Sequence, residues 1–357
     1  MLRRMFLPLL GAASPILAGQ ATATAVAAAG EAVPAGARQQ QPQVPEPAPI
    51  RVAVNEVIVP VTVTDEEGRF VTDLDQKDFQ VFDQGKEQKI GYFSRERNQP
   101  VVVGFLIDTS STSRTHWKTF QEASLDLVQT MLPGDKRYQG YLVSYSTDAE
   151  LQVNTNHDPE KMMEKLRKLK PGGGAAFYDS IYMACTSRDL VKGEPIEPRR
   201  VIVVIGDGHD TSSKKTLAEV LELAQRNLVT IYAISTKAFG FSGEGESNLT
   251  RLAEETGGRV ETPLNTLYKG VSGYLSTPSD EGNYALKVGT GGYASEISTG
   301  LFKSIAALTG EITTQYILRY TPQNSDSAKV FRTIEVKVAL PNVRVRTRKG
   351  YYPLAPQ

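Results

Sequence analysis

The sequence predicts an α/β fold in which a parallel sheet flanked by helices is inserted between two β segments that form a small β-sandwich. Three continuous apolar runs of strand length alternate with stretches of helical periodicity, which is typical of a parallel sheet covered by helices on both faces. Strands that alternate apolar and polar residues precede and follow this region. The three apolar runs are Val101–Ile107, Val201–Ile205 and Val229–Ile234.

Length and composition narrow the class of protein. The chain has 357 residues, which suggests about two domains at roughly 100–200 residues each. Forty basic and forty acidic residues cancel, so the net basic charge typical of nucleic-acid binding is absent. The single cysteine, Cys185, excludes an intramolecular disulfide and a multi-cysteine metal site. The three scattered histidines disfavour a His-rich zinc site.

The N-terminal stretch has the order of a secretory signal peptide, with a basic start at Met1–Arg4, an uncharged apolar run and then small residues. We expect this signal peptide over residues 1–25, and an Ala/Pro/Gln-rich disordered linker over residues 26–49. A membrane anchor is the alternative, but Pro8 and Pro15 interrupt the run and it is shorter than ~20 residues. The prediction is therefore a secreted, periplasmic or cell-surface protein with no membrane span in the mature chain.

Two β segments, residues 50–97 and 313–357, flank an α/β region of residues 98–312. Each segment has roughly forty residues, too few for an independent core, so we expect the two to pair. Pro60 lies within the first strand and predicts an edge strand or a bulge there. The residues that share one face of a strand are Val57, Val59, Val61 and Val63 in the first segment, and Ile334, Val336 and Val338 in the second.

Two of the buried runs lead directly into an aspartate, Asp108 after the first and Asp207 after the second. Ligands of parallel sheets bind beyond the carboxyl ends of the strands, and hydroxyl side chains follow both aspartates. Carboxylate and hydroxyl oxygens suit magnesium, manganese or calcium better than zinc. The alternative is that these residues only cap helices, since Asp and Ser are favoured at helix N-caps.

The arrangement Asp108-x-Ser110-x-Thr112 resembles the metal-ion-dependent adhesion site of von Willebrand factor A domains, whose pattern is Asp-x-Ser-x-Ser. The family's later aspartate matches Asp207. The resemblance implies a Rossmann-like A domain in which these four residues hold Mg²⁺ or another divalent cation, such as Mn²⁺ or Ca²⁺. The family's third loop carries a threonine after a glycine pair, and here Ala175 occupies that position. The resemblance therefore implies weak or absent cation binding.

The order of segments also resembles the bacterial VWFA-related family first recognised in acidobacteria. The residues that carry this resemblance are the strand Asn55–Asp65, the segment Asp78–Gly85, the A domain, and the endings Gln315–Tyr320 and Arg348–Tyr352. It covers most of the expected mature chain. The functions of that family are diverse and poorly defined, so this resemblance implies a fold more than an activity.

The function expected from these features is that of a secreted protein-binding or adhesion module. Its A domain would recruit a protein partner through a cation-bridged acidic side chain of that partner. One alternative is a metal-free structural scaffold of the cell envelope. Another is a secreted metal-dependent hydrolase that uses Asp108, although no nucleophile with an activating base is recognisable, and we expect no enzyme. The candidate partner contacts are His209, Asp210, Phe239 and Phe241.

One long stretch, Leu267–Gly300, is rich in glycine, serine and tyrosine. Its composition predicts a long loop, and such a loop in a compact domain is either functional or mobile.

Overall fold

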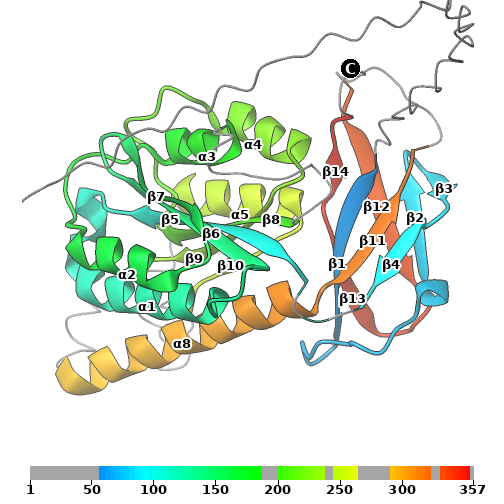
Figure 1. The fold of residues 1–357 in the computed structure, drawn as a ribbon, viewed down its shortest axis with the longest axis horizontal. Helices are drawn as coiled ribbons and strands as arrows, with labels where there is room; N and C mark the ends of the chain where they lie inside the picture. The colour runs from blue at the N-terminus through cyan, green and yellow to red at the C-terminus, as the bar shows by residue number, and fades with distance from the viewer. Residues whose placement is uncertain are drawn as a thin grey trace, which may run out of the picture. The chain divides into compact units, whose positions relative to one another are not determined.

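A computed structural model describes residues 56–95, 97, 99–186, 199–237, 244–263, 290–322 and 330–353 (Figure 1). The contacts divide the chain into residues 1–52 and Ala53–Gln357, and every described residue belongs to the second unit. The expected signal peptide and linker lie outside the described residues. Within the described residues, no helix combines the length and the apolar character needed to cross a membrane.

The α/β region is built on one six-stranded sheet with the order β10-β9-β8-β5-β6-β7. All neighbours are parallel except β7, which runs antiparallel to β6 at the sheet edge. The first two apolar runs are β5 and β8, which lie side by side in the middle of this sheet. The strands are β5 (Val101–Asp108), β6 (Tyr138–Tyr145), β7 (Ala149–Asn156), β8 (Arg199–Gly206), β9 (Thr230–Ser235) and β10 (Val260–Glu261).

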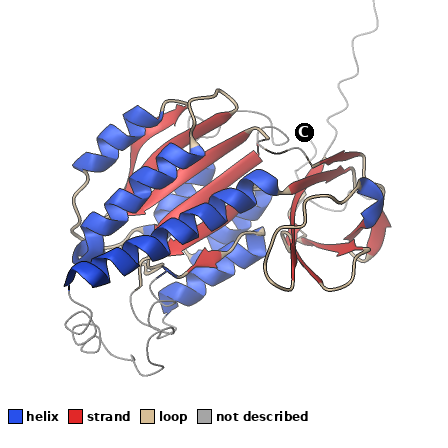
Figure 2. Ribbon diagram, turned by 90° about the horizontal axis from the view of Figure 1, so that it is seen from below, coloured by secondary structure: helices blue, strands red, loops and turns tan. Residues whose placement is uncertain are grey.

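Helices cover both faces of this sheet, as Figure 2 shows. One apolar core joins the sheet to α1, α2 and α8, and a second joins it to α3, α4 and α5. This confirms the predicted α/β class. The helices on the first face are α1 (Trp117–Met131), α2 (Pro159–Lys168) and α8 (Thr290–Thr314), and those on the second are α3 (Phe177–Thr186), α4 (Leu217–Arg226) and α5 (Glu244–Thr256).

The remaining strands form two four-stranded sheets, with the orders β13-β1-β11-β4 and β14-β12-β2-β3. In the first, Val59 pairs with Leu318, and in the second, Val81 pairs with Val336. All four side chains lie in one apolar core, which confirms that the N-terminal and C-terminal β segments share a sandwich. The strands are β1 (Val57–Asp65), β2 (Phe79–Asp83), β3 (Lys86–Gln88), β4 (Tyr92–Ser94), β11 (Tyr316–Tyr320), β12 (Arg332–Val338), β13 (Val343–Arg346) and β14 (Gly350–Tyr351).

The position of Pro60 differs from the expected edge strand. Strand β1 lies between β13 and β11, but β13 pairs only with Thr62–Asp65, so the part of β1 that contains Pro60 has a single strand neighbour. Proline cannot donate a backbone hydrogen bond, and this one-sided pairing accommodates it.

Strand β7 and helix α8 were not expected from the sequence. The antiparallel strand β7 shows no clean alternation, because most of its residues are half-buried. The expected loop Leu267–Gly300 is wrong over its last part, since α8 begins at Thr290, whereas residues 264–289 lie outside the described residues. Burial of the apolar stripe of α8 stabilises the helix more than its interior glycines destabilise it, although each glycine costs about 1 kcal/mol of helix stability. That stripe is Ile297, Leu301, Ile305, Leu308 and Ile312.

Near its C-terminal end, α8 carries a fully buried carboxylate, Glu311. It accepts hydrogen bonds from the Thr62 hydroxyl of the sandwich at 3.1 Å and from the Tyr232 hydroxyl of the sheet at 3.2 Å. It also forms ion pairs with Arg259 at 2.8 Å and Arg346 at 2.5 Å. The buried carboxylate on α8 therefore contacts side chains from the three strands β1, β9 and β13 and from the connection between α5 and β10.

Candidate functional site

The candidate site begins where β5 ends, at the carboxyl edge of the sheet. Asp108 is the last residue of β5 and pairs in register with Tyr145, the last residue of β6. Its side chain is buried, at 2% exposure. The backbone N–H of Ser110 donates to Asp108 Oδ1 at 2.7 Å. The chain turns back on itself here, and this turn fixes the orientation of the carboxylate.

The two hydroxyls expected to assist Asp108 lie next to each other. Ser110 Oγ and Thr112 Oγ1 are 2.8 Å apart, and the Ser113 hydroxyl donates to the Ser110 carbonyl at 2.8 Å. Ser110 is buried, whereas Thr112 is exposed. The loop therefore places one buried and one exposed hydroxyl next to each other, both within four residues of the buried carboxylate.

The second carboxylate, Asp207, directly follows β8, the other neighbour of β5. Its Oδ1 accepts a hydrogen bond from the His209 backbone N–H at 2.9 Å, and its side chain is 14% exposed. Burial raises the pKa of Asp108 to about 6; hydrogen bonds from Ser110 oppose this rise, and the negative charge of Asp207 adds to it. The structure thus brings the two predicted carboxylates within electrostatic range of each other.

The loop that carries Ala175 lies between these two aspartate loops. On one side, the Gly172 N–H donates to the Thr109 carbonyl at 2.7 Å, and the Ser111 N–H donates to the Gly173 carbonyl at 3.1 Å. On the other side, the Ala175 N–H donates to Thr211 Oγ1 at 2.9 Å. Ala175 itself is buried. Three loops therefore meet at this edge, and hydrogen bonds that involve no cation join them.

The residues present fit a divalent cation. Asp108 Oδ2 is buried and accepts no hydrogen bond from the residues that the structure describes, which leaves one carboxylate oxygen available for an ion. The donors are carboxylate and hydroxyl oxygens, the chemistry that magnesium, manganese and calcium prefer. No group of three His, Cys, Asp or Glu residues suited to a metal occurs in the part of the chain that the structure describes. Two carboxylates and two hydroxyls are therefore the candidate ligands here.

The residues expected to contact a partner differ in their surroundings. The His209 side chain is 49% exposed, and its Nδ1 lies 3.7 Å from Asp207 Oδ2. Both oxygens of Asp210 are engaged with backbone donors, from Tyr178 at 2.9 Å and from Ser213 at 3.1 Å. Asp210 therefore holds the first turn of α3. Phe239 and Phe241 lie outside the described residues.

Comparison with known families gives a single assignment. Residues 103–265 match the von Willebrand factor type A domain. The chain contains a von Willebrand factor type A domain. The matched range begins within β5 and ends just after β10, so it includes all four predicted ligands and the Ala175 loop of the A domain.

Several solved structures are similar to the A domain at low identity. Proximal thread matrix protein 1 from the mussel byssus, described with a zinc-occupied MIDAS motif, is 18% identical over 47% of this chain and 43% of that chain, with a TM-score of 0.38. This chain thus spans less than half the length of the mussel protein. BatB from Bacteroides thetaiotaomicron is 16% identical over 58% of this chain and 98% of that chain, with a TM-score of 0.37. The comparison with curated proteins finds no match.

One residue of this edge of the A domain, Tyr145, escaped sequence reasoning. Its ring is buried, and its hydroxyl has no hydrogen-bond partner in the part of the chain that the structure describes. Burial and then the charge of Asp108 raise the pKa of Tyr145 well above its usual value, so the hydroxyl stays protonated. The available signal was its place at the end of the strand that follows Asp108 along the chain.

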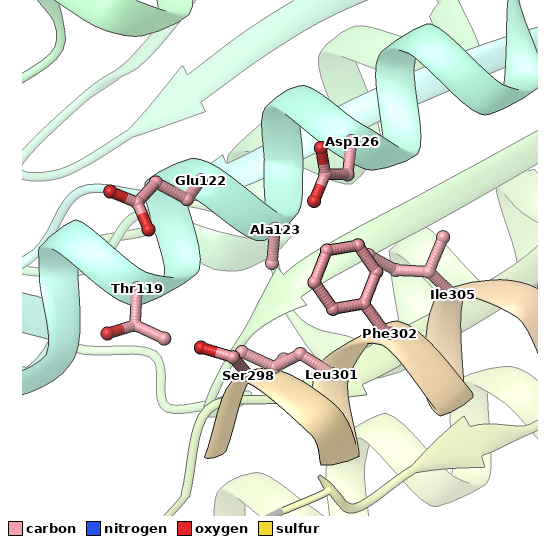
Figure 3. A pocket seen from close by; sticks show the side chains of 8 residues that line it. All are labelled: Thr119, Glu122, Ala123, Asp126, Ser298, Leu301, Phe302 and Ile305. Carbon is pink, nitrogen blue, oxygen red and sulfur yellow. The ribbon is translucent and has the colours of Figure 1, made fainter. Parts of the chain in front are cut away.

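A second feature of the A domain is a groove between α1 and α8 (Figure 3). Its floor is apolar and includes Ala123, Leu301 and Ile305, while the exposed ring of Phe302 borders it. Glu122 and Asp126, one helical turn apart on α1, lie along the other border. The groove lies on the face of the sheet that α1 and α8 cover, whereas Asp108 lies at the carboxyl edge.

We expect Asp126→Asn to raise the free energy of unfolding at pH 7 by about 0.3 kcal/mol. Partial burial and the neighbouring charge of Glu122 raise the pKa of Asp126. A raised pKa means that ionised Asp126 destabilises the folded state. The stability gained with asparagine is therefore present above that pKa and absent at pH 3. Urea unfolding at both pH values measures it. A loss of stability in Asp126→Asn at pH 7 would contradict the assignment of burial and repulsion as the causes.

Proposed function

We propose that this protein is a secreted protein-binding or adhesion module whose A domain presents a weak divalent-cation site to an acidic side chain of a protein partner. The observation that carries the proposal is the buried Oδ2 of Asp108, which has no hydrogen-bond partner among the described residues and lies where three loops meet. A buried carboxylate oxygen without a donor is costly unless a cation or a hydrogen bond compensates it.

The roles of the four ligands follow from their placement. Asp108 supplies the buried carboxylate, and Ser110 and Thr112 supply adjacent hydroxyls on its solvent side. Asp207 adds a second, more exposed carboxylate from the neighbouring strand. The cation, when bound, supplies positive charge and an open position for a carboxylate of the partner. Two carboxylates neutralise a divalent charge, so the partner's carboxylate would make the site anionic unless other groups compensate.

The alternative is a metal-free structural scaffold, and one observation favours it. Ala175 provides no side-chain oxygen. Hydrogen bonds that the N–H groups of Gly172, Ser111 and Ala175 donate to Thr109, Gly173 and Thr211 hold the loops together without an ion. Both the cation-dependent binding module and the metal-free scaffold would be exported through the N-terminal signal peptide. They differ in whether a divalent cation changes the stability of the folded chain.

The change Ala175→Thr tests the cation site directly. We expect it to raise the affinity for Mn²⁺ or Mg²⁺ about tenfold, which corresponds to about 1.4 kcal/mol, because it adds the hydroxyl that the third loop lacks. Isothermal titration and thermal melts with Mg²⁺, Mn²⁺ or EDTA measure it, since a ligand that binds only the folded state raises its melting temperature.

Ala175→Val is the matched control, because valine has the shape of threonine without the oxygen. We expect the valine variant to bind cations no better than the parent chain. Equal melting of the parent and the threonine variant in all three conditions would support the scaffold. A very large shift in the parent chain would show that Ala175 does not weaken the site.

A further inference from the structure

We propose that Tyr145 is a positioning residue for the candidate cation site: its buried hydroxyl donates a hydrogen bond to the Asp108 carboxylate in the cation-bound protein and orients that carboxylate toward the ion. This inference rests on the proposed function, since it requires that a cation binds. It concerns a side chain that belongs to the core of the A domain and not to the four predicted ligands.

The first observation is that both oxygens border the same small space. Asp108 and Tyr145 end neighbouring parallel strands and pair in register, so their side chains leave the same face of the sheet. Both reach the backbone of Gly206 on β8. A Cβ added at Gly206 would contact the Tyr145 hydroxyl, lie 2.9 Å from Asp108 Cβ and lie 3.3 Å from Asp108 Oδ2. A glycine at this position therefore makes room for both groups.

The second observation is that neither oxygen has a hydrogen-bond partner among the residues that the structure describes. Within that part of the chain, Asp108 Oδ2 and the Tyr145 hydroxyl are both buried and both unpaired. Each unpaired buried polar group costs about 1–3 kcal/mol. A phenol is a donor at neutral pH, since its usual pKa is about 10, and a carboxylate is an acceptor. The Tyr145 hydroxyl and the Asp108 carboxylate are thus a donor and an acceptor that border the same space but are not hydrogen-bonded to each other.

A cation at the carboxyl edge provides a reason for them to join. Carboxylates that bind metals are usually held by hydrogen bonds from residues behind them, and losing such a partner typically costs about 10–100-fold in metal affinity. The Tyr145 hydroxyl is buried near Asp108 Oδ2, and a carboxylate oxygen has two lone pairs, so Oδ2 can accept this hydrogen bond and still bind a cation.

The same strand provides an internal comparison in Tyr141. Its ring is also buried, and its hydroxyl packs against a glycine of β5, Gly104. Unlike Tyr145, it donates a hydrogen bond to a backbone carbonyl, that of Ala184, at 3.5 Å. Tyr141 lies four residues, or roughly 13 Å, farther from the carboxyl edge. The two tyrosines thus differ in whether the hydroxyl has a hydrogen-bond partner among the described residues.

The test compares Tyr145→Phe with Tyr141→Phe, by Mn²⁺ titration calorimetry and by thermal unfolding in EDTA. For Tyr145→Phe we expect about tenfold weaker Mn²⁺ binding and a melting temperature in EDTA that equals or exceeds that of the parent chain. Phenylalanine removes an unpaired buried hydroxyl, which costs nothing without the cation. For Tyr141→Phe we expect the opposite pattern: a lower melting temperature in EDTA and Mn²⁺ affinity within twofold of the parent.

Three other outcomes would overturn the inference, and the Mn²⁺ affinity and the melting temperature together distinguish them. Equal Mn²⁺ affinity of the parent and Tyr145→Phe would show that the hydroxyl does not act on Asp108, while leaving the cation site intact. A lower melting temperature of Tyr145→Phe in EDTA, with unchanged Mn²⁺ affinity, would assign the hydroxyl a purely structural role. Absence of Mn²⁺ binding to the parent chain would overturn the proposed function as well, and so is distinguishable from both.

Discussion

Replacing Asp108 with asparagine is expected to stabilise the cation-free protein at pH 7.5 by up to about 3 kcal/mol. Burial raises the pKa of Asp108 to about 6, against about 4 in an unfolded chain. Because the pKa is raised, the folded state prefers the protonated form of Asp108. The stability that this preference gives the parent chain is complete below pH ~4 and is lost as the pH rises through about 6. Asparagine carries no charge to bury, so its stability does not fall over this range.

Urea unfolding of the parent chain and Asp108→Asn from pH 4 to 8 in EDTA measures this difference. Saturating Mg²⁺ should narrow the gap by stabilising only the parent chain, because binding to the folded state alone raises its stability. Asp207→Asn is the matched control, since Asp207 is more exposed and should give a smaller gain. A variant Asp108→Asn that is less stable than the parent in EDTA at pH 7.5 would show that the ionised carboxylate is already compensated.

Asp83→Ala is expected to destabilise the protein by about 3–5 kcal/mol. Asp83 ends β2 and is fully buried in the sandwich. Its carboxylate accepts hydrogen bonds from the Tyr320 and Tyr351 hydroxyls and forms an ion pair with Arg332, all at 2.9 Å. Alanine would remove the carboxylate that pairs with the buried guanidinium of Arg332, and breaking this buried ion pair is the main cost.

Thermal or urea unfolding measures the effect of Asp83→Ala, with Tyr351→Phe as the graded control. That control removes one hydrogen bond and keeps the ion pair, so about 1 kcal/mol is expected. Asp83 belongs to the N-terminal β segment, whereas its three partners belong to the C-terminal one. A loss below 1 kcal/mol in Asp83→Ala would mean that the two segments do not depend on each other for stability.

Much of the candidate site could be predicted because parallel strands end at one edge. Asp108 and Asp207 follow two apolar runs, and the two strands that hold those runs are neighbours. Local sequence also determined that Ser110 and Thr112 lie close to Asp108, since they follow it within four residues. The roles of these four residues as cation ligands stay predictions.

Other parts of the site depend on contacts between distant residues. Tyr145 lies 37 positions from Asp108 in the sequence, and its hydroxyl matters only because the strand register places it beside Gly206. Similarly, the sequence indicated that Ala175 supplies no oxygen, but not that Thr211 would bond to its backbone. Register and loop packing determine such contacts, and no local pattern of residue types encodes them.

The sequence by itself determined the classes of element and their order, because continuous apolar runs, alternating strands and strand-end aspartates are local patterns set by burial and by backbone geometry. It also determined that the two terminal β segments must share a core, since neither can bury enough apolar surface alone. Only the tertiary structure decided that α8 continues through a glycine-containing stretch, that β7 adds an antiparallel edge, and that Glu311 and Asp83 are buried. These features depend on partners far away in the chain, whose packing overrides local propensity.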